Sequence, residues 1–499
     1  MPEKIEMILK GKGIIYIQHH DFRLFEIRHY PPGPAPLPFI GNTLQLGYWV
    51  NKTGSLLNAL KHFKEVYGPI FTLHMGPAPV VMICDYDLAI EAMVKNGNNF
   101  QDRWENPTFS SLRNYKGLAT SSGDYSVEQR RFALHTLRNL GVSRNIMEKR
   151  ILEEWHIRFF FFLYFNQNQV VIPEEFDLFT GSVIYRLLFS VRFTDDDEKL
   201  FTDLKAQLST RKLSFLDAIT PVWALKIPYF RNRVQGVLKP LFSIKDFIEE
   251  QLKERIDAVN DGTHIISDEP DDFVDAFLVE MKKREKDKHP SSFTMETLIC
   301  DTFDLFHAGQ DTTSTTLSWA VCFLLNHPEV EEKIRKELLE VTNGNQDLSQ
   351  ADRQKTPYFN AALNEIQRLS SIITTNLTRY TSEDVEISGV LIRKGIPCTA
   401  QLSMILSDER YFPEPEKFNP DRFMDENKPE NQMVAFGLGK RACLGESLAR
   451  AELYLILGNL IQRYKFEAVD KTPGMEQQNP ASPLRKSNNF QIRLIPVDQ

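Results

Sequence analysis

The sequence lacks any run of apolar residues long enough to cross a membrane. A spanning helix needs about 20 consecutive apolar residues. The first 30 residues offer only Ile14 to Ile17 before Gln18 and two histidines interrupt them. We therefore expect residues 1–29 to be an atypical N-terminal segment with neither a signal peptide nor a membrane anchor.

Cysteine is scarce, and an excess of positive charge is missing. Five cysteines without a pairing pattern argue against a secreted disulfide framework and predict a reducing, cytosol-facing location. Lys and Arg number 59 against 67 Asp and Glu, which gives a net charge of −8. This balance offers no support for nucleic-acid binding.

Glycine- or serine-rich linkers and internal repeats are also absent, although a length of 499 residues would suggest about three domains. Hydrophobic residues make up 42% and charged residues 25%, which suffices for a large core. We expect residues 30–499 to form a single domain, entered through a proline-rich hinge over residues 31–38 that holds the chain extended.

The most informative stretch, residues 436–445, sets one cysteine in a glycine-containing loop before an apolar helix. A helix N-terminus favours the thiolate of Cys443. Gly439 and Gly445 would let the backbone approach a flat ligand, and Arg441 suits a carboxylate. The stretch predicts a thiolate presented to a metal. The alternatives are an inert buried cysteine and a dinucleotide fingerprint, which lacks a βαβ unit around it.

The spacing Phe-x-x-Gly-x-Arg-x-Cys-x-Gly resembles the haem-ligand signature of the cytochrome P-450 monooxygenases, with Phe436, Gly439, Arg441, Cys443 and Gly445 in its positions. The resemblance implies haem b as cofactor, Cys443 as axial iron ligand, Phe436 packed beneath it and Arg441 on a propionate. It also implies a mainly α fold with small β-sheets, in which the haem lies between a long central helix and the helix after the cysteine loop.

A long helix is predicted from near Thr294 to near Asn326, because Pro328 disfavours helical geometry before it. Its roughly 30 residues would span about 45 Å. Glycine in its middle costs about 1 kcal/mol, and a groove for a small ligand would explain Gly309. A short hairpin is expected over residues 71–82, around Gly76-Pro77.

The middle of this helix, Ala308-Gly-Gln-Asp311-Thr312, resembles the family's oxygen-binding motif. The resemblance implies that Asp311 and Thr312 relay protons, which requires a titratable acid and a hydroxyl group. The alternatives are a Thr312 hydroxyl bonded back to the carbonyl four residues earlier and an Asp311 on a solvated helix face.

Glu365 and Arg368 fit an i, i+3 ion pair, although Glu332 and Arg335 fit it equally well. Glu365, Arg368 and Arg422 follow the order that these motifs have in the family, so the resemblance selects them as a structural triad.

The resemblance also assigns Arg379 and Arg130 to the haem propionates. The tryptophan of the family's Trp-x-x-x-Arg-Arg segment is Ser126 here. Because serine cannot replace the area of an indole, this predicts weaker haem binding.

Residues 271–278 resemble the microsomal family-2 branch, which implies insertion of one oxygen atom of O2 into fatty acids or xenobiotics. The electrons would come from NADPH through NADPH–cytochrome P-450 reductase, with cytochrome b5 as a further partner, on the cytosolic face of the endoplasmic reticulum. The implied substrate contacts are His307, Ala308, Ile372, Ile373 and Asn489. The basic group implied to dock the reductase is Arg130, Arg131, Arg138, Arg144, Lys149, Arg150 and Lys440.

Two other functions stay open: a catalytically degenerate haem-binding paralogue or gas sensor, and a haem enzyme that rearranges peroxides. Ser126 and the missing anchor favour the first, whereas Asp311 beside Thr312 argues against both.

Two further segments are unusual. Residues 221–230, followed by Arg231 and Arg233, have the composition of a patch on a membrane surface, with a buried loop as the alternative. The aromatic run Phe159 to Phe165 is too short to span a bilayer, and either a core helix or an error in the encoded sequence would account for it.

Overall fold

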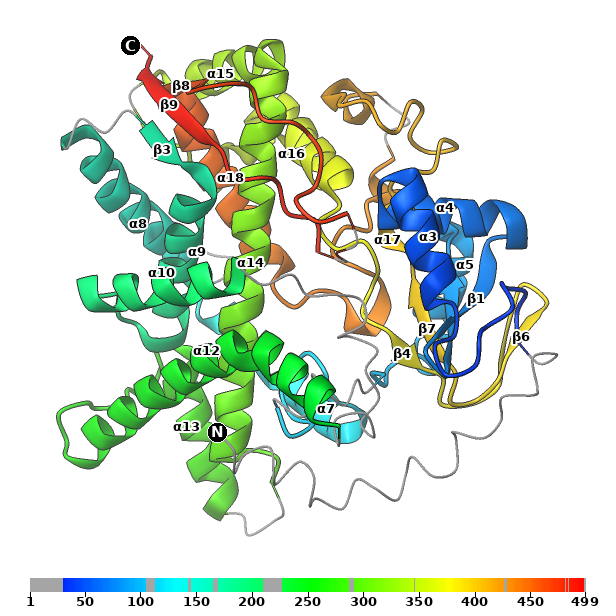
Figure 1. Ribbon diagram of the computed structural model, residues 1–499. Helices are drawn as coiled ribbons and strands as arrows, with labels where there is room; N and C mark the ends of the chain where they lie inside the picture. Colours follow the sequence, from blue (N-terminus) through cyan, green and yellow to red (C-terminus); the bar gives the residue numbers. More distant parts are fainter. Residues whose placement is uncertain are drawn as a thin grey trace.

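The computed structural model describes residues 30–104, 113–141, 145–164, 169–209, 227–286, 291–344, 346–425, 429–480, 482 and 484–497. The predicted N-terminal segment 1–29 lies outside these residues. The predicted mainly α fold with small sheets is confirmed (Figure 1). The α-helices are α3 (Thr43–Thr53), α4 (Leu56–Tyr67), α5 (Tyr86–Ile90), α7 (Gly123–Asn139), α8 (Asn145–Tyr164), α9 (Ile172–Phe189), α10 (Asp195–Ser209), α12 (Pro228–Asn260), α13 (Phe273–Lys286), α14 (Met295–Asn326), α15 (Pro328–Thr342), α16 (Pro357–Ser370), α17 (Leu402–Ile405) and α18 (Glu446–Arg463).

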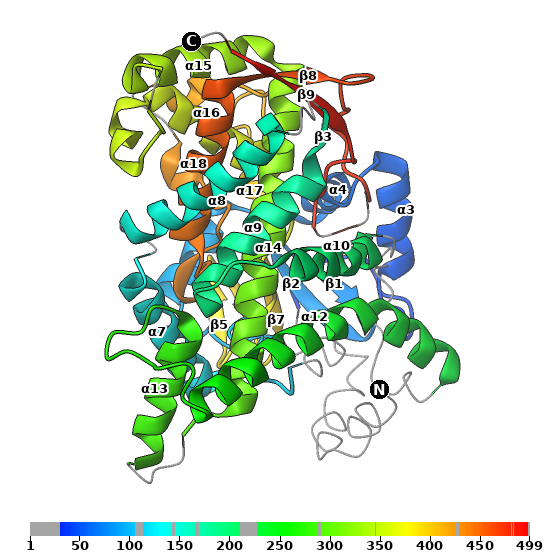
Figure 2. The same ribbon diagram turned by 90° about the vertical axis from the view of Figure 1, so that its left-hand side faces the viewer.

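Helix α14 runs through the middle of the molecule and is crossed by α9 and α10 (Figure 2). Its start is fixed by Thr294, whose side chain accepts a hydrogen bond from the backbone N–H of Thr297. It ends at Asn326, ahead of Pro328, so the predicted bounds are confirmed. Its 32 residues span about 48 Å, long enough to cross the molecule and to present a site from its middle.

The sheets are small. The hairpin predicted from Gly76-Pro77 is confirmed: β1 (Ile70–Met75) pairs antiparallel with β2 (Ala78–Ile83), and Gly76 has φ +61° at the turn. This sheet continues through β7 (Pro397–Ala400) to β4 (Arg379–Tyr380), in the order β1-β2-β7-β4. The other strands are β3 (Gln169–Val171), β9 (Gln491–Pro496) and β8 (Tyr464–Ala468) in one sheet, and β5 (Val385–Ile387) with β6 (Val390–Ile392) in another.

Gly309 in the middle of α14 has a packing reason rather than the small-ligand groove expected from the sequence. A Cβ built at Gly309 would lie 3.0 Å from Cδ1 of Ile184 on α9. Such a contact is too close for an unshifted side chain, so the glycine lets the two helices approach. The close packing of α9 on α14 also fixes the polar side chains of both helices near the next turn.

The described part of the chain contains no helix with both the length and the apolar character needed to span a bilayer. The unusual aromatic run continues helix α8 as far as Tyr164, and Phe165 lies outside the described residues.

Asp301 on α14 is a buried carboxyl group without a counterion. It is fully buried, and neither side-chain oxygen has a hydrogen-bond partner within the described structure. Desolvation, and next the negative charge of Asp304, raise its pKa well above the ordinary value. Asp304 itself is ion-paired with Arg113. Asp301 is therefore held as a neutral acid, in contrast to its neighbour one turn away.

We predict that Asp301→Asn raises the thermal midpoint of the protein at neutral pH. Because the folded-state pKa of Asp301 is raised, wild type loses stability as the pH increases from about 4 toward that pKa. The asparagine side chain cannot ionise, so the stability of the variant relative to wild type should increase over the same pH interval. Thermal unfolding of both proteins between pH 4 and 8 measures this difference, and a difference independent of pH would contradict the prediction.

Candidate functional site

Cys443 lies in a loop just before α18, whose N-cap is Gly445. The loop folds back on itself because the N–H of Cys443 donates to the carbonyl of Phe436 at 2.9 Å. The guanidinium of Arg450 lies over the Phe436 ring at 4.8 Å. All five cysteines are described, and Cys443 alone is exposed. Desolvation by the surrounding loops raises the pKa of its thiol, while the backbone N–H of Gly445 acts in the opposite direction.

The two glycines expected to face a flat ligand have different environments. Gly439 has φ +69°, and a Cβ there would lie 1.9 Å from the carbonyl oxygen of Met93. Position 439 therefore requires glycine, because any side chain there would collide with the protein backbone. Gly445 has an ordinary φ of −93°, and a Cβ there would meet no protein atom within 4 Å. The protein itself does not require glycine at this second position.

Four arginines gather around the cysteine loop: Arg103, Arg130, Arg379 and Arg441. Arg130 donates to the carbonyl of Ala442 at 2.8 Å, and Arg379 donates to that of Leu438 at 2.9 Å. A backbone bridge joins Arg103 to Arg379. Within the described residues none of the four is ion-paired with a carboxylate.

These arginines therefore carry unbalanced positive charge. Burial first, and then the neighbouring guanidinium groups, lower the pKa of Arg441 to about 9 and that of Arg379 to about 10. The Nε atoms of both are buried without a hydrogen-bond partner. A buried cluster of like charges with unused donors fits a ligand that carries carboxylates.

Ser126 has a role that the sequence did not suggest. It is buried on α7, and its hydroxyl oxygen accepts a hydrogen bond from Arg441 at 2.5 Å. The serine therefore supports one of the clustered arginines. Weaker haem binding caused by Ser126 stays a prediction.

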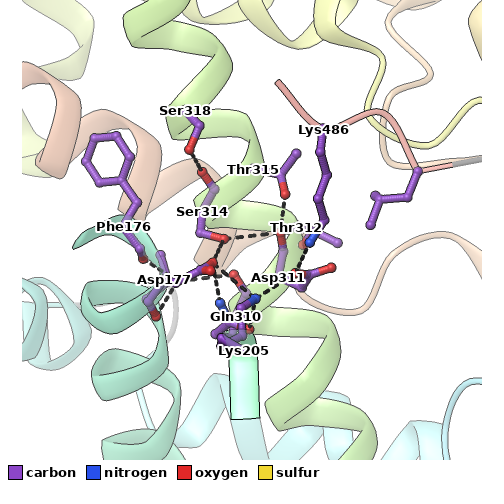
Figure 3. Close-up of polar contacts among 12 residues, drawn as sticks. Phe176, Asp177, Lys205, Gln310, Asp311, Thr312, Ser314, Thr315, Ser318 and Lys486 are labelled. Atoms are coloured by element: carbon purple, nitrogen blue, oxygen red, sulfur yellow. Dashed lines mark hydrogen bonds and ion pairs between the residues drawn. The ribbon is translucent and has the colours of Figure 1, made fainter. Parts of the chain in front are cut away.

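The acid and hydroxyl of α14 differ in their bonding. The Thr312 hydroxyl donates to the carbonyl of Ala308 at 2.8 Å, which is the back-bonded alternative considered from the sequence. Asp311 is not on a solvated face, because its side chain is only 13% exposed. Its carboxylate accepts hydrogen bonds from Lys205 at 2.8 Å and from Lys486 at 2.7 Å (Figure 3).

Of the expected substrate contacts, His307 and Ala308 lie one turn before Asp311 and Thr312 on α14. His307 stacks on Phe303, and burial lowers its pKa to about 4, so its imidazole is neutral at physiological pH.

Ile372 and Ile373 follow α16 and lie beside the C-terminal segment. Ile373 forms a backbone bridge with Leu484, and the N–H of Arg485 donates to the carbonyl of Ile372. Asn489 is exposed, and no described side-chain contact brings it to the other four residues.

The structure brings Glu365, Arg368 and Arg422 together. Arg368 donates to both carboxylate oxygens of Glu365, at 2.7 and 2.9 Å, and Arg422 donates to one of them at 3.1 Å. Arg335 also pairs with Glu332, at 2.6 Å. The i, i+3 spacing alone therefore does not separate the two pairs.

Four residues near the site were missed by the sequence reasoning: Arg103, Lys205, Lys486 and Glu452. Glu452 on α18 is buried, and desolvation raises its pKa to about 8 despite a hydrogen bond with Thr313 on α14. None of the four lies in a motif, and a single charged residue in an apolar stretch is the one signal that could have found Glu452.

The comparisons with known proteins agree with this geometry. The family model for cytochrome P450 matches residues 31–494. The chain belongs to the cytochrome P450 family. The probable cytochrome P450 cyp-35D1 of Caenorhabditis elegans is 36% identical over 92% of this chain and 93% of the relative. Cytochrome P450 2C3 of Oryctolagus cuniculus is 36% identical over 89% and 90%, and cytochrome P450 2H2 of Gallus gallus is 35% identical over 88% of each.

The protein is therefore a cytochrome P450 monooxygenase with haem b as its cofactor. Its family uses redox partners, O2 and lipophilic substrates. The residues around Cys443 fit this group, because the exposed sulfur can ligate iron and the arginine cluster can bind the two propionates.

We predict that Arg379→Gln speeds haem loss and stabilises the haem-free chain. The substitution removes a charged donor to a carboxylate, worth about 1.5–3 kcal/mol, so loss to apo-myoglobin should be at least roughly tenfold faster. In the haem-free chain it removes repulsion within the arginine cluster and should raise the unfolding midpoint. Arg393→Gln, on the exposed loop after β6, is the control. Equal effects of the two variants would contradict the prediction.

Proposed function

We propose that Cys443 is the axial ligand of the haem iron and that Arg130, Arg379 and Arg441, together with Arg103, bind the propionates. The carrying observation is the combination of one exposed cysteine with an arginine cluster that has no carboxylate partner in the described part of the chain. Bound haem b supplies the activation of dioxygen. The protein contributes the sulfur ligand, the counter-charge for the propionates and the exclusion of water.

Asp311 and Thr312 are proposed to move protons on the opposite side of the haem. The Thr312 hydroxyl donates to Ala308, which leaves its oxygen free to accept a further hydrogen bond. Asp311 lies next to it on α14 and is linked through Lys486 to the more exposed C-terminal segment. The pair thus joins the Thr312 hydroxyl to ionisable groups that lead to the C-terminal segment.

The proposed reaction inserts one oxygen atom of O2 into a lipophilic substrate, a fatty acid or a xenobiotic. NADPH–cytochrome P-450 reductase is the proposed electron donor, with cytochrome b5 as a further partner. Arg131 and Arg138 on α7, Lys149 on α8 and Lys440 in the cysteine loop support this, because all four are exposed. Arg130 and Arg150 instead donate to backbone carbonyls, and Arg144 lies outside the described residues.

A degenerate haem-binding paralogue, a gas sensor and a peroxide-rearranging enzyme are less well supported. The first two were favoured by Ser126 in the place of the family's tryptophan. This serine accepts a hydrogen bond from Arg441, so it supports the arginine and does not favour these alternatives.

We predict that the reduced wild-type protein with CO shows the strongly red-shifted Soret band of thiolate ligation. Cys443→Ala should lose this band, because alanine offers no ligand to iron. Cys398→Ala, which removes a buried cysteine from β7, is the matched control and should keep the band. A red-shifted band in Cys443→Ala would exclude Cys443 as the ligand.

Association with the endoplasmic reticulum membrane is also proposed, with residues 30–499 as a single catalytic domain. Of the predicted surface patch, residues 221–226 lie outside the described structure. Ile227, Tyr229 and Phe230 are described and exposed, at the start of α12. Exposed apolar and aromatic side chains followed by arginines suit a membrane surface.

We predict that Tyr229→Asp/Phe230→Asp weakens binding to vesicles of phosphatidylcholine and phosphatidylserine. The wild-type chain should float with the vesicles, whereas the double variant should stay mostly in the soluble fraction. Ile265→Asp tests a single exposed apolar residue elsewhere, 84% exposed, and should behave as wild type. Wild type that does not float would rule out the patch.

A further inference from the structure

Three separate parts of the chain meet at one oxygen atom. Oδ1 of Asp311 on α14 accepts hydrogen bonds from Lys205 of α10 and from Lys486 of the segment that leads into β9. The two lysines approach this side of α14 from different elements (Figure 3). A single carboxylate therefore ties α10 and the C-terminal segment to the central helix.

The two lysines are not held equally. The Lys205 side chain is 11% exposed, and it also donates to Oε1 of Gln310 at 3.0 Å and pairs with Asp177 at 3.2 Å. The Lys486 side chain is 40% exposed and has no other acceptor among the described residues. Lys486 therefore has the weaker attachment and the easier exchange with water.

The Lys205 side of the cluster is also anchored from α9. Oδ1 of Asp177 accepts hydrogen bonds from Gln310 at 2.7 Å and from Ser314 at 2.5 Å, both on α14. The other titratable group that acts on Asp311 is His307, whose imidazole is neutral; Arg113, which acts on His307, is paired with Asp304. Motion within the cluster is thus easiest at Lys486.

We propose that Lys486 is a positioning residue that closes the C-terminal segment onto α14, and that its release makes Asp311 available as a proton carrier. This inference rests on the proposed function, because it concerns the acid assigned there to proton transfer. The released state differs from the closed one by one ion pair at the exposed end, while Lys205 and Asp177 keep their contacts.

The electrostatics give the reason. Burial alone would raise the pKa of Asp311, but the ammonium groups of Lys205 and Lys486 outweigh it and hold the pKa far below its ordinary value. In the closed state Asp311 is therefore a carboxylate at every physiological pH and cannot donate a proton. When the ammonium group of Lys486 moves away, the pKa of Asp311 rises because burial is then opposed by one ammonium group fewer. The carboxyl group can then take up a proton.

The first test measures hydrogen exchange in the haem-loaded full chain. Lys486→Met should speed amide exchange in residues 484–490 by roughly tenfold, because it removes one charged hydrogen bond. Lys486→Arg keeps the ion pair and should exchange as wild type, as should Lys471→Met on an exposed turn. Unchanged exchange in Lys486→Met would overturn the proposal.

The second test measures peroxide released per NADPH between pH 6 and 8.5, with lauric acid as the probe and added reductase. The ratio should be independent of pH in wild type and in Lys486→Arg. In Lys486→Met it should fall as the pH falls, because protonated Asp311 becomes populated at the acidic end. Faster exchange with a pH-independent ratio would also overturn the proposal. A reduced, CO-bound wild-type protein without the red-shifted Soret band would instead refute the proposed function. The hydrogen-exchange result does not depend on that band.

Discussion

The positive charge that four arginines place beside Cys443 is the constraint on which the rest of this structure depends. Other buried arginines of the described core, such as Arg368 and Arg335, are paired with carboxylates. Around Cys443 the acceptors are backbone carbonyls and one serine, which leave the charge unbalanced. Since burying unpaired charge is costly, a dianionic cofactor bound here as proposed would stabilise this region as well as supply its chemistry.

Helix α14 shows that environment rather than residue type sets the ionisation of an acid. It carries Asp301, Asp304 and Asp311 within three turns. Asp301 has no partner and is held neutral, Asp304 is paired with one arginine, and Asp311 is bound by two lysines. Of these three acids, only Asp311 lies next to Thr312, the hydroxyl residue of the family motif. The proton transfer proposed for this helix would therefore take place where α10 and the C-terminal segment reach it.

The features that could be predicted from the sequence are those with local signals. Thr294 and Pro328 bound α14, Gly76-Pro77 marks the hairpin, and the spacing around Cys443 indicates a loop before α18. The missed residues depend on distant partners. Lys205 and Lys486 lie 106 and 175 residues from Asp311, and Arg103 donates to a carbonyl 274 residues away. No spacing along the chain reports such contacts, so the acid could be named but its two cations could not.

The two charged clusters have opposite consequences for what binds beside them. Among the described residues the arginines have no carboxylate partner, and they therefore suit a ligand with carboxylates. On the other side, Lys205 and Lys486 are balanced by Asp177 and Asp311, so this cluster has no net charge. A neutral, hydrogen-bonded cluster exerts only a weak field on a neighbouring molecule. It therefore agrees with the lipophilic substrates of the family, and it is consistent with the proposal that the ionisable groups near α14 serve proton transfer rather than substrate recognition.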